Sequence, residues 1–235
     1  MSTDAAILPT LAKALRLPTI SRRCVDLAET ATAESWPVTR YLRALFDEEL
    51  SDRADRRVTR LLHNAQLPVG KTLAGFDWKA VPGLDRRRIN ALAQDPGWVE
   101  RGDNLLLFGP SGVGKTHLAA GIVHGLITLG QTARYYRTTD LVQHLQAARA
   151  EHQLPKALSR LDRFSLLILD DIGYARRGDG DASVLFELIA HRYERRSLIV
   201  TSNHAFSRWD EIFTDSSMTV ATIDRLIHHA VILEI

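Results

Sequence analysis

The chain has 235 residues, of which 45% are hydrophobic and 25% charged, a composition typical of a globular protein that can bury a sizeable core. Its 30 basic and 28 acidic side chains give a net charge of +2, so net charge by itself does not indicate a nucleic-acid partner. The single cysteine, Cys24, excludes an internal disulfide. The apolar runs are too short to span a membrane and the N-terminus lacks the pattern of a signal peptide, so we expect a cytoplasmic protein with no membrane partner.

The first 66 residues predict a helical region. They contain no glycine, and apolar side chains recur among charged ones at helical spacing, as at Tyr41, Leu45 and Phe46. Proline and glycine then appear with apolar residues over 67–103, which indicates a linker that packs against the domain after it. We therefore expect a helical region over 1–66, a linker over 67–103 and a core domain over 104–235.

From residue 104 onward, short apolar runs alternate with segments of helical pattern. This alternation is typical of an α/β fold in which a parallel sheet carries helices on both faces. We expect a five-stranded parallel sheet, with strands at Leu105–Phe108, Ala133–Tyr136, Leu166–Leu169, Leu198–Thr201 and Val231–Ile235.

The segment 109–116 reads Gly-Pro-Ser-Gly-Val-Gly-Lys-Thr and matches the phosphate-loop pattern G-x-x-x-x-G-K-[ST] between a predicted strand and a predicted helix. Lys115 is expected to reach the β- and γ-phosphates of ATP, and the Thr116 hydroxyl to ligate Mg²⁺. The alternative is a glycine-rich turn between strand and helix. The residues expected to hold the nucleotide are Gly109, Pro110, Ser111, Gly112, Val113, Gly114, Lys115 and Thr116.

Polar residues also follow two other predicted strands. Asp170 and Asp171 end the apolar run at 166–169, as in a Walker-B strand, so we expect Asp170 to hold the metal and Asp171 to polarise the attacking water. Asn203 ends the strand at 198–201 and could orient that water or sense the γ-phosphate. The alternatives are a helix cap for the aspartates and a turn for Asn203. The guanine-reading sequence Asn-Lys-x-Asp is absent, which favours ATP over GTP.

Together these motifs resemble the AAA+ ATPases of the initiator and helicase-loader branch, and more closely the IstB-like proteins that assist insertion-sequence transposition. The resemblance implies a P-loop AAA+ core in which Asn203 is sensor 1. It also implies that Arg225 is an arginine finger acting in a neighbouring subunit, and hence an oligomer in the form of a ring or spiral. The segments that carry it are Lys71–Trp78, Asn104–Ala119, Leu167–Tyr174, Arg192–Arg196, Thr201–Asn203 and Asp224–His229.

The sequence departs from the AAA+ pattern in two respects. Position 171 holds Asp where AAA+ proteins usually have Glu, and the shorter side chain implies slow or tightly controlled hydrolysis, although Asp-Asp is usual in the IstB-like group. Most relatives carry a helical lid after the last strand, whereas this sequence ends at Ile235. We therefore expect a minimal or missing lid, and sensor 2 has no candidate.

The resemblance further implies binding of duplex DNA and control of a transposase. Candidate DNA contacts are two arginine groups, Arg86, Arg87 and Arg88 in a basic stretch and Arg176 and Arg177 after the Walker-B strand. Such basic runs are more often solvated surface or a mobile connection. A replicative-helicase loader is the alternative function, and a P-loop small-molecule kinase, for which neither a lid nor an acceptor pocket has a candidate, is the third.

Overall fold

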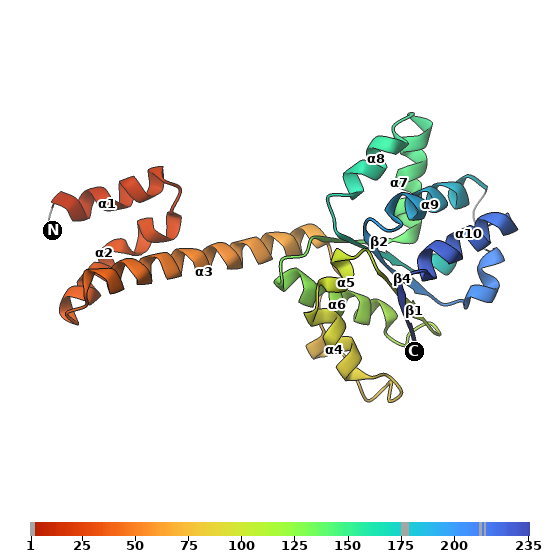
Figure 1. Ribbon diagram of the computed structural model, residues 1–235, viewed down its shortest axis with the longest axis horizontal. Helices are drawn as coiled ribbons and strands as arrows, with labels where there is room; N and C mark the ends of the chain where they lie inside the picture. Colours follow the sequence, from red (N-terminus) through yellow and green to blue (C-terminus); the bar gives the residue numbers. More distant parts are fainter. Residues whose placement is uncertain (1–2, 175–178, 212, 214) are drawn as a thin grey trace. The chain divides into compact units, whose positions relative to one another are not determined.

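A computed structural model describes residues 3–174, 179–211, 213 and 215–235 (Figure 1). The chain divides into two compact units, Met1–Arg60 and Leu61–Ile235. Residues 61–103, which contain the expected linker, therefore belong to the same compact unit as the sheet. No helix in the described ranges is both long enough and apolar enough to cross a membrane.

The N-terminal unit is helical, as predicted. Its helices are α1 (Thr3–Ala14), α2 (Pro18–Ala33) and α3 (Val38–Ala65), the last of which continues into the second unit. Ile20, Cys24 and Leu45 belong to its small apolar core. The buried carboxylate of Glu49 on α3 accepts hydrogen bonds from the backbone N–H groups of Thr19 (2.8 Å) and Ile20 (3.2 Å), so a side chain of one helix satisfies the free N–H groups at the start of another.

Within the described residues of the second unit, five strands form one sheet in the order β2-β3-β4-β1-β5, and every pair of neighbouring strands is parallel. The predicted five-stranded parallel sheet is confirmed, with strand ends that move by one residue or less. The strands are β1 (Asn104–Phe108), β2 (Ala133–Arg137), β3 (Leu166–Asp170), β4 (Ser197–Ser202) and β5 (Ala230–Glu234).

Helices cover both faces of the sheet, as expected for strands that are apolar on both sides. One face packs against α4 (Arg86–Gln94), α5 (Gly97–Glu100) and α6 (Lys115–Thr128). The other face packs against α7 (Thr138–Ala150), α8 (Leu154–Leu161), α9 (Asp179–Arg192) and α10 (Ser216–Ile227). Short 3-10 turns connect these elements at η1 (Leu73–Gly75), η2 (Ile172–Tyr174) and η3 (Phe206–Glu211). The sequence pattern did not predict α8, an amphipathic helix that begins beside Pro155.

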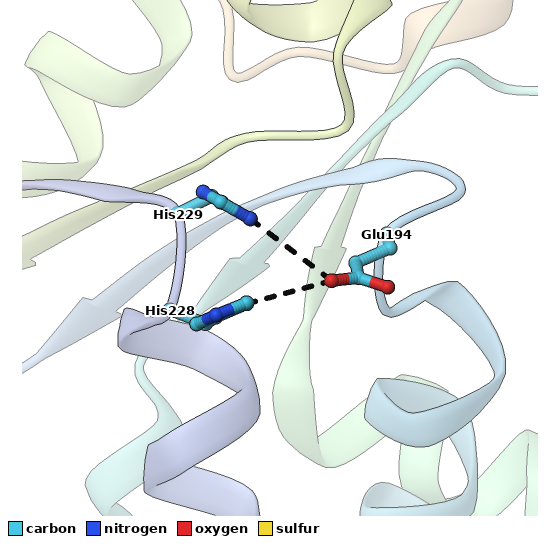
Figure 2. A group of neighbouring side chains, drawn as sticks. All are labelled: Glu194, His228 and His229. Atoms are coloured by element: carbon cyan, nitrogen blue, oxygen red, sulfur yellow. Dashed lines mark ion pairs between the residues drawn. The ribbon is translucent and has the colours of Figure 1, made fainter.

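At the amino-terminal ends of β4 and β5, the turns that follow α9 and α10 come together. Glu194 on the first turn faces His228 and His229 on the second (Figure 2). Arg192, at the end of α9, is buried and donates hydrogen bonds to the carbonyl oxygens of Phe164 (3.1 Å) and Ser197 (3.1 Å). Burial lowers the pKa of Arg192 to about 9, so the guanidinium stays charged at neutral pH and ties the ends of β3 and β4 together.

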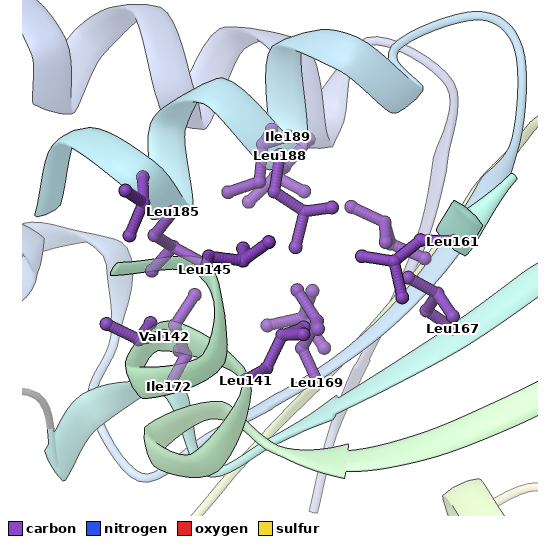
Figure 3. Close-up of a cluster of buried hydrophobic side chains, with 14 of the residues drawn as sticks. Leu141, Val142, Leu145, Leu161, Leu167, Leu169, Ile172, Leu185, Leu188 and Ile189 are labelled. Atoms are coloured by element: carbon purple, nitrogen blue, oxygen red, sulfur yellow. The ribbon is translucent and has the colours of Figure 1, made fainter. Parts of the chain in front are cut away.

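The core forms because successive side chains of each strand point to opposite faces of the sheet. On β3, Leu167 and Leu169 join the apolar cluster under α7, α8 and α9 (Figure 3), whereas Leu166 and Ile168 join the cluster under α6. All of these side chains are fully buried. The strand is therefore fixed from both sides, and the residues at its carboxyl end are held rigidly.

Candidate nucleotide-binding site

The phosphate-loop segment connects β1 to α6, as the sequence predicts. Gly112 and Gly114 adopt left-handed backbone conformations, with φ of +86° and +99°. A Cβ atom at Gly114 would lie 2.7 Å from Cε2 of Phe76, so glycine is required there by both conformation and space. The loop thus brings its backbone N–H groups and the start of α6 to the carboxyl end of the sheet, the arrangement that binds phosphate.

Lys115, at the start of α6, lies at the centre of this arrangement. Its Nζ donates to the carbonyl oxygens of Gly109 (2.8 Å) and Pro110 (2.7 Å) and to Oδ1 of Asn203 (2.5 Å). Burial lowers the pKa of Lys115, while the carboxylates of Asp171 and Asp170 oppose that shift. The ammonium group is therefore poorly hydrated and close to where a phosphate would lie.

Asp170 ends β3 and is surrounded by hydroxyl groups. Its carboxylate accepts hydrogen bonds from the hydroxyls of Thr116 (2.9 Å), Thr201 (2.7 Å) and Tyr135 (2.8 Å). Burial, and then the bond to Asp170, raise the pKa of Tyr135, which keeps this phenol a proton donor. The Thr116 hydroxyl and the Asp170 carboxylate are the hard oxygen ligands that Mg²⁺ prefers, and their proximity fits a magnesium ion next to the loop.

Asp171 follows β3 with a left-handed backbone, φ +62°, a conformation that is uncommon for residues other than glycine. Two contacts hold it: its N–H donates to the Thr201 hydroxyl (2.8 Å), and its Oδ1 accepts from Nδ2 of Asn203 (3.1 Å). Burial, and then the charge of Asp170, raise the pKa of the Asp171 carboxyl, while Lys115 and His204 lower it. Asn203 thus connects Lys115 to Asp171 through its side-chain amide.

A cleft of about 410 Å³ lies over the loop, a size in the range of small-molecule sites. One wall comes from the segment around η1, which is tied to α6 because Nε2 of His117 donates to the carbonyl oxygen of Thr72 (2.8 Å). Besides loop residues, the cleft is lined by Lys71, Phe76, Asp77, Ala80, Val81, Asp171, Thr201 and Asn203.

The structure brings together the loop residues 109–116 and three predicted residues beyond them, Asp170, Asp171 and Asn203. It does not bring Arg225 to the cleft. The guanidinium of Arg225 lies on α10, 5.3 Å from the centre of the Phe186 ring, and donates to the carbonyl oxygen of Ala221. Arg86, Arg87 and Arg88 are exposed at the start of α4, and Arg176 and Arg177 lie outside the described residues.

The residues of the site that the sequence did not predict include Tyr135, Thr201 and Phe76. The signal for Thr201 was present, since it lies in the same polar strand end as Asn203. Tyr135 belongs to a strand whose position beside β3 no local pattern gives, and Phe76 precedes the loop by more than 30 residues. Both act through tertiary contacts.

Comparison with known proteins shows which family this chain belongs to. The family model of the IstB-like ATP binding protein matches residues 10–235. The chain belongs to the IstB-like ATP-binding family. A relative in Sinorhizobium fredii, whose name describes an insertion-sequence ATP-binding protein, is 49% identical over 98% of this chain and 78% of its own length. The ATP-binding protein named for insertion sequence IS5376 of Geobacillus stearothermophilus is 36% identical over 94% of this chain and 88% of its own length.

Solved structures agree on the fold of this IstB-like chain. The crystal structure of the DnaC helicase loader resembles it with a TM-score of 0.54 and 26% identity, over 63% of this chain and 86% of the loader. This likeness, together with the sheet order and the phosphate loop, identifies the AAA+ fold that the sequence predicted. The resemblance stated from the motifs, an IstB-like member of the AAA+ superfamily, is confirmed.

Proposed function

We propose that this IstB-like protein hydrolyses ATP with Mg²⁺ and uses the nucleotide state to control DNA transposition through assembly on duplex DNA. The observation that carries the ATPase proposal is the chain of hydrogen bonds from Lys115 through Asn203 to Asp171. It joins the residue that would contact the γ-phosphate to the residue that would polarise water.

Each residue of the cleft has a separate role in this proposal. The N–H groups of the loop and Lys115 bind the β- and γ-phosphates, and Thr116 and Asp170 hold the metal. When bound, Mg²⁺ would neutralise charge on the phosphate oxygens. Asp171 accepts a hydrogen bond from the attacking water, and Asn203 fixes the Asp171 carboxylate beside it. Because an aspartate is one methylene shorter than glutamate, we expect slow turnover.

Arg225 would complete the site of a neighbouring subunit as an arginine finger. Its placement away from its own cleft supports a role in trans, and its guanidinium is partly exposed. Arg225→Ala should abolish hydrolysis while ATP binding by the isolated subunit is retained. Arg160→Ala, which changes an exposed arginine on α8, is the matched control. Loss of both ATP binding and hydrolysis in Arg225→Ala would contradict the trans role.

The exposed start of α4 supports the proposal of DNA binding. The Arg86 guanidinium lies 5.3 Å from the centre of the Trp78 ring, Trp78 contacts Phe76, and Phe76 packs against Gly114 in the loop. A continuous set of contacts therefore runs from a basic helix to the nucleotide cleft, a route by which phosphate binding could bias DNA contacts. Arg176 and Arg177 remain candidate DNA contacts.

The test measures ATPase rate, assembly size and duplex-DNA binding with ATP, with ADP and without nucleotide. We expect ATP to favour larger assemblies and tighter DNA binding, with hydrolysis reversing both. DNA binding that is identical in all three states would overturn the coupling, and ATP turnover that no DNA changes would separate the ATPase from its proposed role. A partner transposase would be sought by its binding to the ATP-bound assembly on DNA.

A helicase-loader function is the second candidate, and the likeness to the DnaC loader favours it. The relatives named for insertion sequences favour transposition, since they match nearly the whole chain at higher identity. Binding of this chain to a transposase on DNA, measured against binding to a replicative helicase, discriminates the two.

A further inference from the structure

A second group of side chains lies at the opposite end of the sheet from the nucleotide cleft. Glu194 precedes β4, and His228 and His229 precede β5. They come from Arg192–Arg196 and Asp224–His229, segments that carry the family resemblance but do not line the cleft. The nucleotide site therefore does not explain why these residues meet.

The geometry of the group is that of ligands around a small cation. Oε1 of Glu194 lies 3.5 Å from Nδ1 of His228 and 4.0 Å from Nε2 of His229 (Figure 2). The three ligand atoms lie within 4.8 Å of one another. In a tetrahedral zinc site, with ligands about 2.1 Å from the metal, neighbouring ligand atoms are about 3.4 Å apart. These exposed side chains can close that difference by small rotations.

The backbone under the group is already fixed by Asn104 at the start of β1. The carbonyl oxygen of His229 accepts from the N–H of Asn104 (2.7 Å). The Asn104 side chain donates to the carbonyl oxygen of Leu226 (3.1 Å) and accepts from the N–H of Leu198 (2.9 Å). A single buried residue thus holds the turn after α10 against the start of β4. Metal binding would therefore need little further ordering of the backbone.

The ends of two helices favour a cation at this group. α9 ends at Arg192 and α10 ends at Ile227, so the negative ends of two helix dipoles point toward the group. Arg195, the nearest cationic neighbour in sequence, pairs with Asp162 (3.5 Å). The hydroxyl of Tyr193 lies 2.7 Å from Nδ1 of His228 and would give way to the metal or bind beside it.

We propose that Glu194, His228 and His229 bind one divalent transition-metal ion of the Zn²⁺ class, with water completing its coordination. Two imidazoles and a carboxylate suit Zn²⁺, Co²⁺ or Ni²⁺, whereas Mg²⁺ prefers oxygen ligands alone. The bound ion clamps the turn after α9 to the turn after α10, and it therefore stabilises the helix that carries Arg225.

The test titrates the metal-free full-length chain with Zn²⁺ by calorimetry and with Co²⁺ by visible absorption, in excess Mg²⁺ and without ATP. We expect one ion per chain and a higher melting temperature with Zn²⁺. His229→Gln and Glu194→Gln should each weaken binding at least tenfold and remove the thermal shift. His144→Gln and Glu151→Gln change exposed residues outside the group and should bind as the wild type does.

Several results would overturn this proposal. They are an absence of Zn²⁺ binding by the wild type, binding that both group variants retain, or binding that the control variants lose equally. Circular dichroism and melting of each variant in EDTA distinguish loss of the site from loss of the fold. Because no readout uses ATP, the outcome is independent of the proposed ATPase activity.

Discussion

The two units of the chain bury their apolar residues to very different extents. In the second unit, β1 and β3 are buried at every position between two layers of helices. In the N-terminal unit, large apolar side chains stay exposed just after α1 and along α3, with Leu15 at 71%, Val38 at 73% and Leu50 at 66%. Burial of apolar surface is the main stabilising contribution to folding. The second unit is therefore expected to be the more stable one, and the N-terminal unit to depend more on individual polar contacts.

The nucleotide site belongs entirely to the better-packed unit. Its polar residues lie at the ends of buried strands, so the network around Asp170 has fixed geometry. Changes in one unit should consequently leave the other nearly unaffected, and variants can test that separation.

The largest effect is expected at Lys115. Lys115→Met removes the charge that would stabilise the transferred phosphate, and we expect ATPase activity to fall by a factor on the order of 10³. Both units should still fold, because the lysine makes its contacts at the cleft. Steady-state kinetics and circular dichroism test this, with Lys156→Met on α8 as the control. Retained turnover would refute the assigned role.

The next largest effect concerns the buried Arg192. Arg192→Met leaves the carbonyl oxygens of Phe164 and Ser197 without their donors, at a cost of about 3 kcal/mol in the free energy of unfolding. Denaturant unfolding should show the loss in the second unit, while the N-terminal unit unfolds as before. Arg196→Met, an exposed change in the same segment, serves as the comparison. Equal losses in the two variants would show that burial of Arg192 is unimportant.

A smaller effect is expected in the N-terminal unit at Glu49. Glu49→Gln weakens the bonds to the start of α2 and to Arg53, and should cost about 1 kcal/mol. Burial tends to raise the pKa of Glu49, but the bonds from Arg53, Ile20 and Thr19 outweigh it, and the pKa is lowered. The stabilisation is therefore complete above the usual glutamate range and is lost as the pH falls through the lowered pKa.

Thermal unfolding between neutral and acid pH tests this expectation. The wild-type N-terminal unit should lose stability in acid, and Glu49→Gln should lack that part of the pH dependence. Glu29→Gln, an exposed change on α2, should lose thermal stability in acid to the same extent as the wild type. If Glu49→Gln loses stability in acid as the wild type does, the hydrogen bonds between Glu49 and the start of α2 are not the source of the pH dependence.

The smallest effect is expected at Tyr135, which donates to the carboxylate of Asp170, the proposed metal ligand. Tyr135→Phe keeps the ring but frees that carboxylate, so Mg²⁺ should be needed at a concentration up to about tenfold higher for half-maximal ATPase activity. ATP binding without metal should not change. Tyr136→Phe, the next residue on β2, provides the matched control. A lowered maximal rate with an unchanged Mg²⁺ requirement would indicate a different role.

How far the sequence predicts the molecule depends on whether a feature is local. The apolar run at 105–108 and the glycines before Lys115 specify a strand and a loop by themselves, so the fold and the phosphate loop were predictable. Tyr135 and Thr201 donate hydrogen bonds to Asp170 from neighbouring strands. No local sequence pattern predicts which strands are neighbours, so these contacts could not be predicted. The burial of Arg192 follows from the packing of α9 on the sheet, which the sequence of the segment does not show by itself.

The hydrogen bonds of Lys115 have a consequence for selectivity. Its ammonium group has acceptors in Gly109, Pro110 and Asn203, so binding of a nucleotide would exchange these partners for phosphate oxygens. A neutral nucleoside has no phosphate oxygens that could replace these acceptors. A polyphosphate offers more negative charge than a carbonyl or an amide, so under the proposed function it would compete with Asn203 for the ammonium group.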